Sequence, residues 1–203
     1  MFDFITGWIE QGGLLAVAAL MVLENVFPPI PSELIIPLAG FSAARGEFNI
    51  LALVAVATAG SVLGSSLWYA LGLWLGEERF LRLVDRHGVW LTLTRGEAEA
   101  ATAWFRRHGP WAVLLGRLVP TVRTLISVPA GLSGMGVTPF LLYTAAGTAA
   151  WTPVLAGAGW LLGENYEAVE RWLNPVTTAV VAGIVGLYLW RLVRGLRARR
   201  RGG

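Results

Sequence analysis

Four charged side chains stand inside otherwise apolar stretches of the sequence, and they are the residues best suited to do chemistry. Glu24 and Glu33 lie in one stretch, and Arg117 and Arg123 lie in another. A charged residue at the centre of a membrane helix costs at least about 2.5 to 3.5 kcal/mol on insertion scales, so such residues mark a functional cavity by default. A structural interpretation stays open, in which two buried ion pairs only lock the segments together.

The residue types indicate an anionic ligand and a proton. The planar guanidinium of Arg binds phosphate through two parallel hydrogen bonds and stays charged at any working pH. Arg117 and Arg123 lie on either side of Pro120, so both can converge on one anion. Carboxylates are poor ligands for phosphate, but they exchange protons readily. The combination predicts proton-linked movement of an anionic headgroup.

The composition indicates whether these residues lie in water or in a lipid bilayer. The chain has 203 residues, of which 55% are hydrophobic and 14% are charged, whereas a soluble domain carries roughly 25% charged residues. The charge-free stretches 48–76, 124–163 and 172–190 are long enough to cross a bilayer, which takes about 20 apolar residues. These features predict an integral membrane protein and exclude a cytosolic enzyme. The absence of cysteine excludes a disulfide scaffold and thiol or cysteine-metal chemistry.

The positions of the basic residues predict a topology. All 16 are Arg, with six at 79–107 and six in the tail at 191–201, and the positive-inside rule places both regions in the cytoplasm. We expect the tail to touch anionic lipid headgroups and not nucleic acid. The first 23 residues carry Asp3 and Glu10 but no basic residue, so we expect them to be retained and not cleaved as a signal peptide.

The segments that carry the four charged residues are interrupted, which predicts re-entrant hairpins. Broken backbone at membrane depth is tolerated only where protein or a water-filled cavity surrounds it. The expected breaks are Pro28, Pro29 and Pro31 in the first hairpin and Pro120, Pro129 and Gly131 in the second. The predicted order is a re-entrant hairpin at 11–45, a span at 48–76, a cytoplasmic amphipathic segment at 77–109, a second hairpin at 110–136, spans at 138–163 and 174–192, and a basic cytoplasmic tail at 193–203.

An internal repeat favours this arrangement. Offsetting the chain by 87 residues places 58–77 over 145–164 with six identities in twenty positions, and an offset of 91 aligns 38–40 with 129–131. A chance match between Gly-rich and Ala-rich spans stays open. A true repeat predicts an all-α polytopic membrane protein of two inverted repeats, each a re-entrant hairpin plus a transmembrane helix, followed by a C-terminal transmembrane helix. The hairpin tips would then meet near the midplane.

The sequence resembles the DedA family, also called SNARE-associated or VTT-domain membrane proteins, over about residues 12–165. The resemblance rests on three motifs: Glu24-Asn25-x-x-Pro28-Pro29-x-Pro31-x-Glu33, Gly60-x-x-x-Gly64, and Gly116-Arg117-x-x-Pro120-x-x-Arg123-Thr124. It implies that Glu24 and Glu33 are essential membrane acidic residues and that Arg117 and Arg123 are essential arginines. All four family positions are filled.

The same resemblance implies a lipid transporter of the bacterial cytoplasmic membrane. Bacterial members are regarded as flippases for undecaprenyl phosphate or for phospholipids and are linked to the proton gradient, and eukaryotic relatives are lipid scramblases. We therefore expect a polyprenyl phosphate or phospholipid partner, no metal and no cofactor, with a homo-oligomer left open. A non-selective scramblase for lipids such as phosphatidylethanolamine, a membrane lipid phosphatase and a structural membrane protein remain as alternatives.

Overall fold

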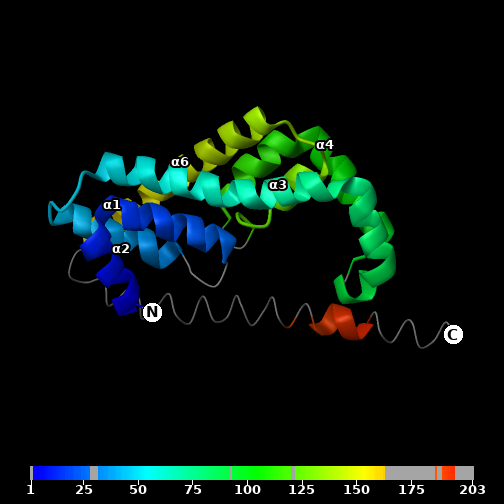
Figure 1. The fold of residues 1–203 in the computed structure, drawn as a ribbon, viewed down its shortest axis with the longest axis horizontal. Coiled ribbons are helices and arrows are strands. Elements are labelled where there is room, and N and C mark those ends of the chain that lie inside the picture. The colour runs from blue at the N-terminus through cyan, green and yellow to red at the C-terminus, as the bar shows by residue number, and fades with distance from the viewer. Residues whose placement is uncertain are drawn as a thin grey trace.

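The computed structural model describes residues 2–27, 32–91, 93–119, 122–162, 186 and 189–194, and the chain in this part is helical. Figure 1 shows the helices packed as a bundle, with the end of α3 and the start of α4 extending to one side. The bounds are α1 Phe2–Val26, α2 Ser32–Ala44, α3 Ile50–Leu91, α4 Arg95–Arg117, α5 Ser127–Leu132 and α6 Val137–Leu162.

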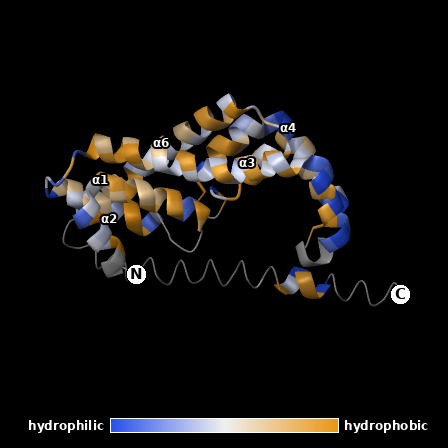
Figure 2. Ribbon diagram, viewed as in Figure 1, coloured by the Kyte–Doolittle hydropathy of each residue, from blue (hydrophilic) through white to orange (hydrophobic). Residues whose placement is uncertain are grey.

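Hydrophobic residues predominate in the helices of the bundle, and hydrophilic residues gather where α3 ends and α4 begins (Figure 2). By length and composition, Ile5–Val26 and Ile50–His87 can each cross a membrane, with mean hydropathies of 1.5 and 2.0. The sequence predicted a span in α3 but assigned the first of these segments to a re-entrant hairpin. The predicted span at 138–163 corresponds to α6, a helix of 26 residues without a charged side chain. The predicted span at 174–192 lies almost wholly outside the described residues.

The first hairpin consists of two short helical arms. A break at Gly13 divides α1, where φ is 53° and ψ is −138°, a left-handed conformation that glycine adopts without steric cost. The arms 14–26 and α2 are each about 20 Å long, against about 30 Å for the hydrocarbon core. α1 ends at Val26 and α2 begins at Ser32, and the prolines predicted as breaks, Pro28, Pro29 and Pro31, lie outside the described residues.

The second hairpin differs from the sequence-based prediction. Its first arm is the end of α4, which continues unbroken across the predicted boundary at 109/110. Pro129 and Gly131 were predicted as breaks, but both lie inside α5. Proline is tolerated there because it occupies the first turn of the helix, whose N–H groups have no partner within the helix. Between α4 and α5 the chain is irregular, and Pro120, within this connection, lies outside the described residues.

The predicted amphipathic segment at 77–109 is a helical hairpin and not a single helix. α3 bends at Gly76, where φ is 66°, and α4 starts after Thr94 with a capping box. Leu81 and Val84 of α3 pack against Ala98 of α4, and Arg106 pairs with Glu77 at 2.9 Å between Nη2 and Oε1. The hairpin therefore has a small core of its own, on the side of the bundle where hydrophilic residues gather.

The two halves of the chain pack on each other through equivalent glycine contacts. Gly131 of α5 lies directly against the backbone of Tyr69 in α3, and Gly40 of α2 lies in the same way against Ala156 in α6. These pairs are related by offsets of 91 and 87 residues, the offsets of the sequence repeat. The short helix of each half is therefore packed against the long helix of the other half.

Candidate functional site

The ends of helices position the four charged residues. Glu24 lies in the last turn of α1 and Glu33 in the first turn of α2, while Arg117 is the last residue of α4 and Arg123 lies in the connection to α5. Breaks in the two hairpins thus bring these residues to the same depth in the bundle. Glu24, Arg117 and Arg123 have only 3%, 2% and 9% of their surface exposed, so their charges are compensated by protein groups and not by bulk water.

Arg123 connects the two hairpins through carboxylates. Its Nη2 donates to Oε1 of Glu24 and lies 3.6 Å from Oε2 of Glu33. Both carboxylates belong to the first hairpin and the guanidinium belongs to the second. Ion pairing of buried groups explains how charges are held in an apolar bundle, although it does not by itself stabilise the fold.

Arg117 is held by neutral groups. Its Nη2 donates to Oγ of Ser127 at 2.8 Å, and its Nη1 lies 3.4 Å from Oδ1 of Asn25. Among the described residues, no carboxylate lies within 4.0 Å of this guanidinium. A buried cation whose direct partners are an amide and a hydroxyl retains the capacity to bind an anion.

Asn25 joins the two arginines and anchors them to α3. Its Nδ2 lies 2.8 Å from Oε2 of Glu24 and 3.0 Å from Oγ of Ser61, and its Oδ1 accepts from Oγ of Ser65 at 2.9 Å. Its backbone carbonyl accepts from the indole of Trp68 at 2.8 Å. In the sequence, Asn25 was singled out only as part of a motif. The available signal was an amide next to Glu24 in an apolar helix, where a polar side chain needs a partner.

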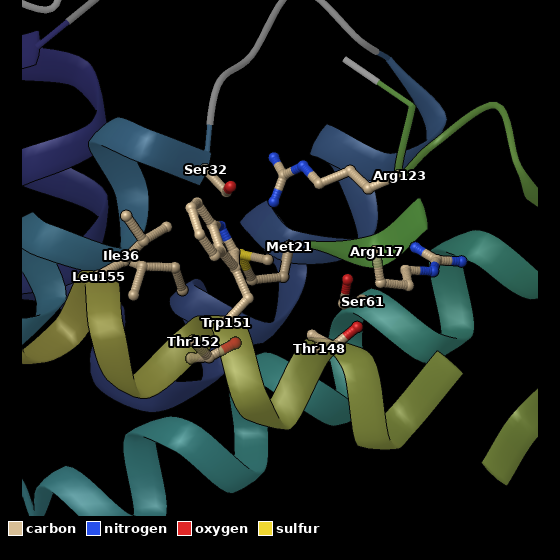
Figure 3. A pocket seen from close by; sticks show the side chains of 10 residues that line it. All are labelled: Met21, Ser32, Ile36, Ser61, Arg117, Arg123, Thr148, Trp151, Thr152 and Leu155. Atoms are coloured by element: carbon tan, nitrogen blue, oxygen red, sulfur yellow. The ribbon is translucent and has the colours of Figure 1, made fainter. Parts of the chain in front are cut away.

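A narrow cavity of about 10 Å³, open on one side, lies between the hairpins and α6. Arg117 and Arg123 both line it. Figure 3 shows the guanidinium of Arg123 directed toward Ser32 and that of Arg117 directed the opposite way, so the predicted convergence on one anion stays a prediction. Three residues of α6, Thr148, Trp151 and Thr152, form the opposite wall, which Figure 3 shows facing the arginines. Sequence reasoning missed this wall, because Thr and Trp in an apolar helix are ordinary packing residues. The remaining lining residues are Met21, Ser32, Ile36, Ser61 and Leu155.

The arrangement suits the binding of an anion. Each buried guanidinium offers N–H donors, and a low local dielectric strengthens their interaction with a negative charge. Glu24 and Glu33 both contact Arg123, so binding an anion at Arg123 requires that a carboxylate move or take up a proton.

The two histidines lie outside this site. His87 is exposed near the end of α3, and His108 is exposed in α4, where its ring stacks on Trp104 with centroids 5.1 Å apart. Within the part of the chain that the structure describes, no three His, Cys, Asp or Glu side chains gather as a metal site. That the protein works without a metal or cofactor stays a prediction.

The described part of the chain is all helical, with several apolar helices around a site of buried charged residues. A profile of the VTT domain matches residues 30–161. The chain belongs to this family, the VTT-domain or DedA membrane proteins.

Several bacterial proteins share this similarity over most of their length. Undecaprenyl phosphate transporter A of Staphylococcus aureus is 32% identical over 99% of this chain and 99% of its own. A Lactococcus lactis subsp. cremoris protein named alkaline phosphatase-like protein is 37% identical over 98% of this chain and 94% of its own. The inner membrane protein YghB of Escherichia coli is 33% identical over 79% of this chain and 72% of its own. No solved structure matches the chain.

Proposed function

We propose that this membrane protein moves a phosphate-bearing lipid, undecaprenyl phosphate, across the bacterial cytoplasmic membrane with proton coupling. The observation that carries the proposal is the cavity lined by two buried arginines. Arg117 holds no carboxylate within 4.0 Å among the described residues, so it can receive a phosphate without first breaking an ion pair. The name of the Staphylococcus aureus relative supports the choice of lipid.

Protons regulate the second arginine. Arg123 is paired with Glu24 and lies beside Glu33, so it is occupied while both carboxylates are charged. Protonation of either carboxylate weakens this pairing and frees Arg123 to bind the phosphate together with Arg117. Coupling thus arises in two steps. Protonation of a carboxylate breaks its ion pair with Arg123, and the phosphate then takes the place of that carboxylate.

The lipid tail stays in the bilayer while the phosphate enters the cavity. An unpaired phosphate in hydrocarbon would carry a prohibitive desolvation cost, which a cationic cavity removes. In this mechanism the two hairpins re-enter the membrane from opposite sides as inverted repeats, and the basic tail lies in the cytoplasm. The short arms of the first hairpin and the equivalent glycine contacts of the two halves support this topology.

A lipid phosphatase is the second candidate, because a relative with 37% identity is named alkaline phosphatase-like protein. Buried arginines would also suit hydrolysis of a phosphate ester, but that reaction needs a nucleophile or a metal-bound water. Release of inorganic phosphate from the lipid distinguishes this candidate from transport, in which the lipid is recovered intact.

The experiment is reconstitution into liposomes containing labelled undecaprenyl phosphate or labelled phosphatidylethanolamine, with and without a pH gradient. We expect gradient-dependent exchange of the prenyl phosphate, lost in Arg117→Ala and Arg123→Ala. Arg45→Ala is the matched control, since Arg45 is exposed and pairs only with Glu47 at 3.4 Å among the described residues. Equal exchange of both lipids without a gradient would identify a scramblase, and unchanged exchange in both cavity variants would contradict the proposal.

A further inference from the structure

The cavity has a second set of polar groups that the network around Asn25 does not use. Ser32 is the first residue of α2, and Trp151 lies in the middle of α6. Both line the cavity together with Arg123. None of the hydrogen bonds to Asn25 involves Ser32 or Trp151, so these residues are not needed to hold the arginines in place.

Three buried polar atoms at this wall have no hydrogen-bond partner among the described residues: Nε1 of Trp151, Oγ of Ser32 and Nε of Arg123. A buried donor without a partner costs about 1 to 3 kcal/mol, and native proteins rarely leave such atoms unpaired without a reason. The indole and guanidinium N–H groups can only donate. The partner that satisfies them must therefore supply acceptor oxygens.

These groups face one another. Figure 3 shows the guanidinium of Arg123 directed toward Ser32 and Trp151, while the guanidinium of Arg117 is directed away from them. The wall formed by Ser32 and Trp151 is thus associated with Arg123, the arginine that the carboxylates hold. A ligand that displaces Glu24 from Arg123 comes within reach of both.

We propose that Trp151 and Ser32 bind the lipid phosphate directly and, with Nε of Arg123, select a terminal phosphate over a phosphodiester. This inference rests on the proposed function. A terminal phosphate carries about −1.5 to −2 charges over three non-bridging oxygens, whereas a phosphodiester carries a single charge over two. The terminal phosphate therefore forms the stronger charge-assisted hydrogen bonds with these donors. A phosphodiester headgroup would also have to place a second substituent beside these groups, in a narrow cavity.

The test separates a ligand from a packing residue. Trp151→Phe removes the N–H and keeps most of the ring, and Ser32→Ala removes one hydroxyl. Trp160→Phe is the matched control in the same helix, at an exposed position, and Ser42→Ala is the control for the second buried serine of α2. Each variant in detergent is titrated with undecaprenyl phosphate, with phosphatidylethanolamine and with inorganic phosphate, and its thermal unfolding is recorded.

We expect Trp151→Phe to weaken undecaprenyl phosphate binding about tenfold, since a hydrogen bond to a charged group is lost. Binding of phosphatidylethanolamine should change less than twofold. Unfolding should be unaffected or shifted to higher temperature, because the variant removes a donor that has no partner in the empty protein. Ser32→Ala should act in the same direction, and both controls should bind as the wild type does.

Three results would overturn the inference. Wild-type affinity in both Trp151→Phe and Ser32→Ala would show that the phosphate does not reach this wall, even if the arginine variants confirm transport. An equal loss for both lipids together with lower thermal stability would assign Trp151 to packing. Inorganic phosphate binding as tightly as the prenyl phosphate would identify free phosphate as the ligand. Failure of the wild type to bind either lipid would instead contradict the proposed function.

Discussion

Oδ1 of Asn25 lies 3.4 Å from Nη1 of Arg117, across 92 positions of the chain. This contact joins the last turn of α1 to the end of α4, so the helix break that follows Asn25 and the one that follows Arg117 are held together by neutral groups. The amide orients the guanidinium without neutralising it. Arg117 consequently stays positioned and charged inside an apolar bundle.

Replacing Asn25 should destabilise the whole bundle. Asn25→Ala leaves Arg117, Glu24 and Ser65 with a buried partner missing, which we expect to lower the free energy of unfolding by about 3 kcal/mol. Asn49→Ala is the matched control, because Asn49 accepts from the backbone N–H of Leu51 at an exposed helix start and its loss should cost about 1 kcal/mol. Chemical unfolding in detergent compares the two variants, and equal losses would show that Asn25 is not central to packing.

The carboxylate of Glu24 should set the dependence of transport on the pH gradient. Glu24→Gln keeps the size of the side chain but removes its charge permanently, as a proton would, so Arg123 is left with Glu33 at 3.6 Å. We expect prenyl phosphate binding to be retained or increased and the response to the gradient to disappear. The liposome exchange assay measures this. A Glu24→Gln protein that still responds fully to the gradient would place the coupling proton elsewhere.

The glycine contacts between the two halves predict a steric effect. A Cβ at Gly131 would overlap the backbone of Tyr69, and one at Gly159 would overlap that of Pro37. We expect Gly131→Ala and Gly159→Ala each to cost about 1 to 3 kcal/mol, the usual range for overpacking. Gly157→Ala is the control in α6, because no atom lies within 4 Å of a Cβ placed there. Thermal unfolding of the four proteins, wild type included, should separate Gly157→Ala from the two others.

The capping box of α4 predicts a pH effect outside the proposed membrane region. Hydrogen bonds from the backbone N–H and the hydroxyl of Thr94 lower the pKa of the Glu97 carboxyl. A group whose pKa falls on folding contributes stability above its unfolded pKa and loses it as the pH falls through the folded value. Thr94→Ala should therefore destabilise the protein by about 1 kcal/mol near pH 7 and by less near pH 3.

Thermal unfolding of wild type and Thr94→Ala at both pH values tests this prediction. Thr102→Ala is a second hydroxyl variant of the same region, in which Oγ1 donates to the carbonyl of Ala98 at 2.9 Å and has no carboxylate partner among the described residues. Its effect should not depend on pH. A Thr94→Ala penalty that is the same at pH 3 and pH 7 would show that the charge of Glu97 does not contribute to the cap.

Local patterns predicted part of this architecture. The motif Gly60-x-x-x-Gly64 is typical of a face that allows close helix packing, and Gly60 and Gly64 do lie against α1. The apolar part of α3 was also predicted, as a span at 48–76, from the positions of the charged residues. The helix does bend at Gly76. These predictions succeed because close approach of backbones depends directly on the absence of a side chain.

Other features depended on partners that a single sequence does not reveal. Pro129 and Gly131 look like a break, yet they form α5 because Gly131 fits against Tyr69 in a distant helix. Asn25 became prominent only when Ser61, Ser65 and Arg117 were brought around it by tertiary packing. The wall of α6 was missed for the same reason, since Thr148 and Trp151 face a cavity only in the folded bundle.

The glycine contacts have a further consequence for how the protein is assembled. α5 belongs to the second half of the chain but packs mainly on α3, and α2 belongs to the first half but packs mainly on α6. The arrangement is an exchange of short helices within one molecule, comparable to a domain swap between two copies. Neither half can complete its own packing, so the folding unit is the entire bundle. Each half folds fully only when the other half is present to pack against it.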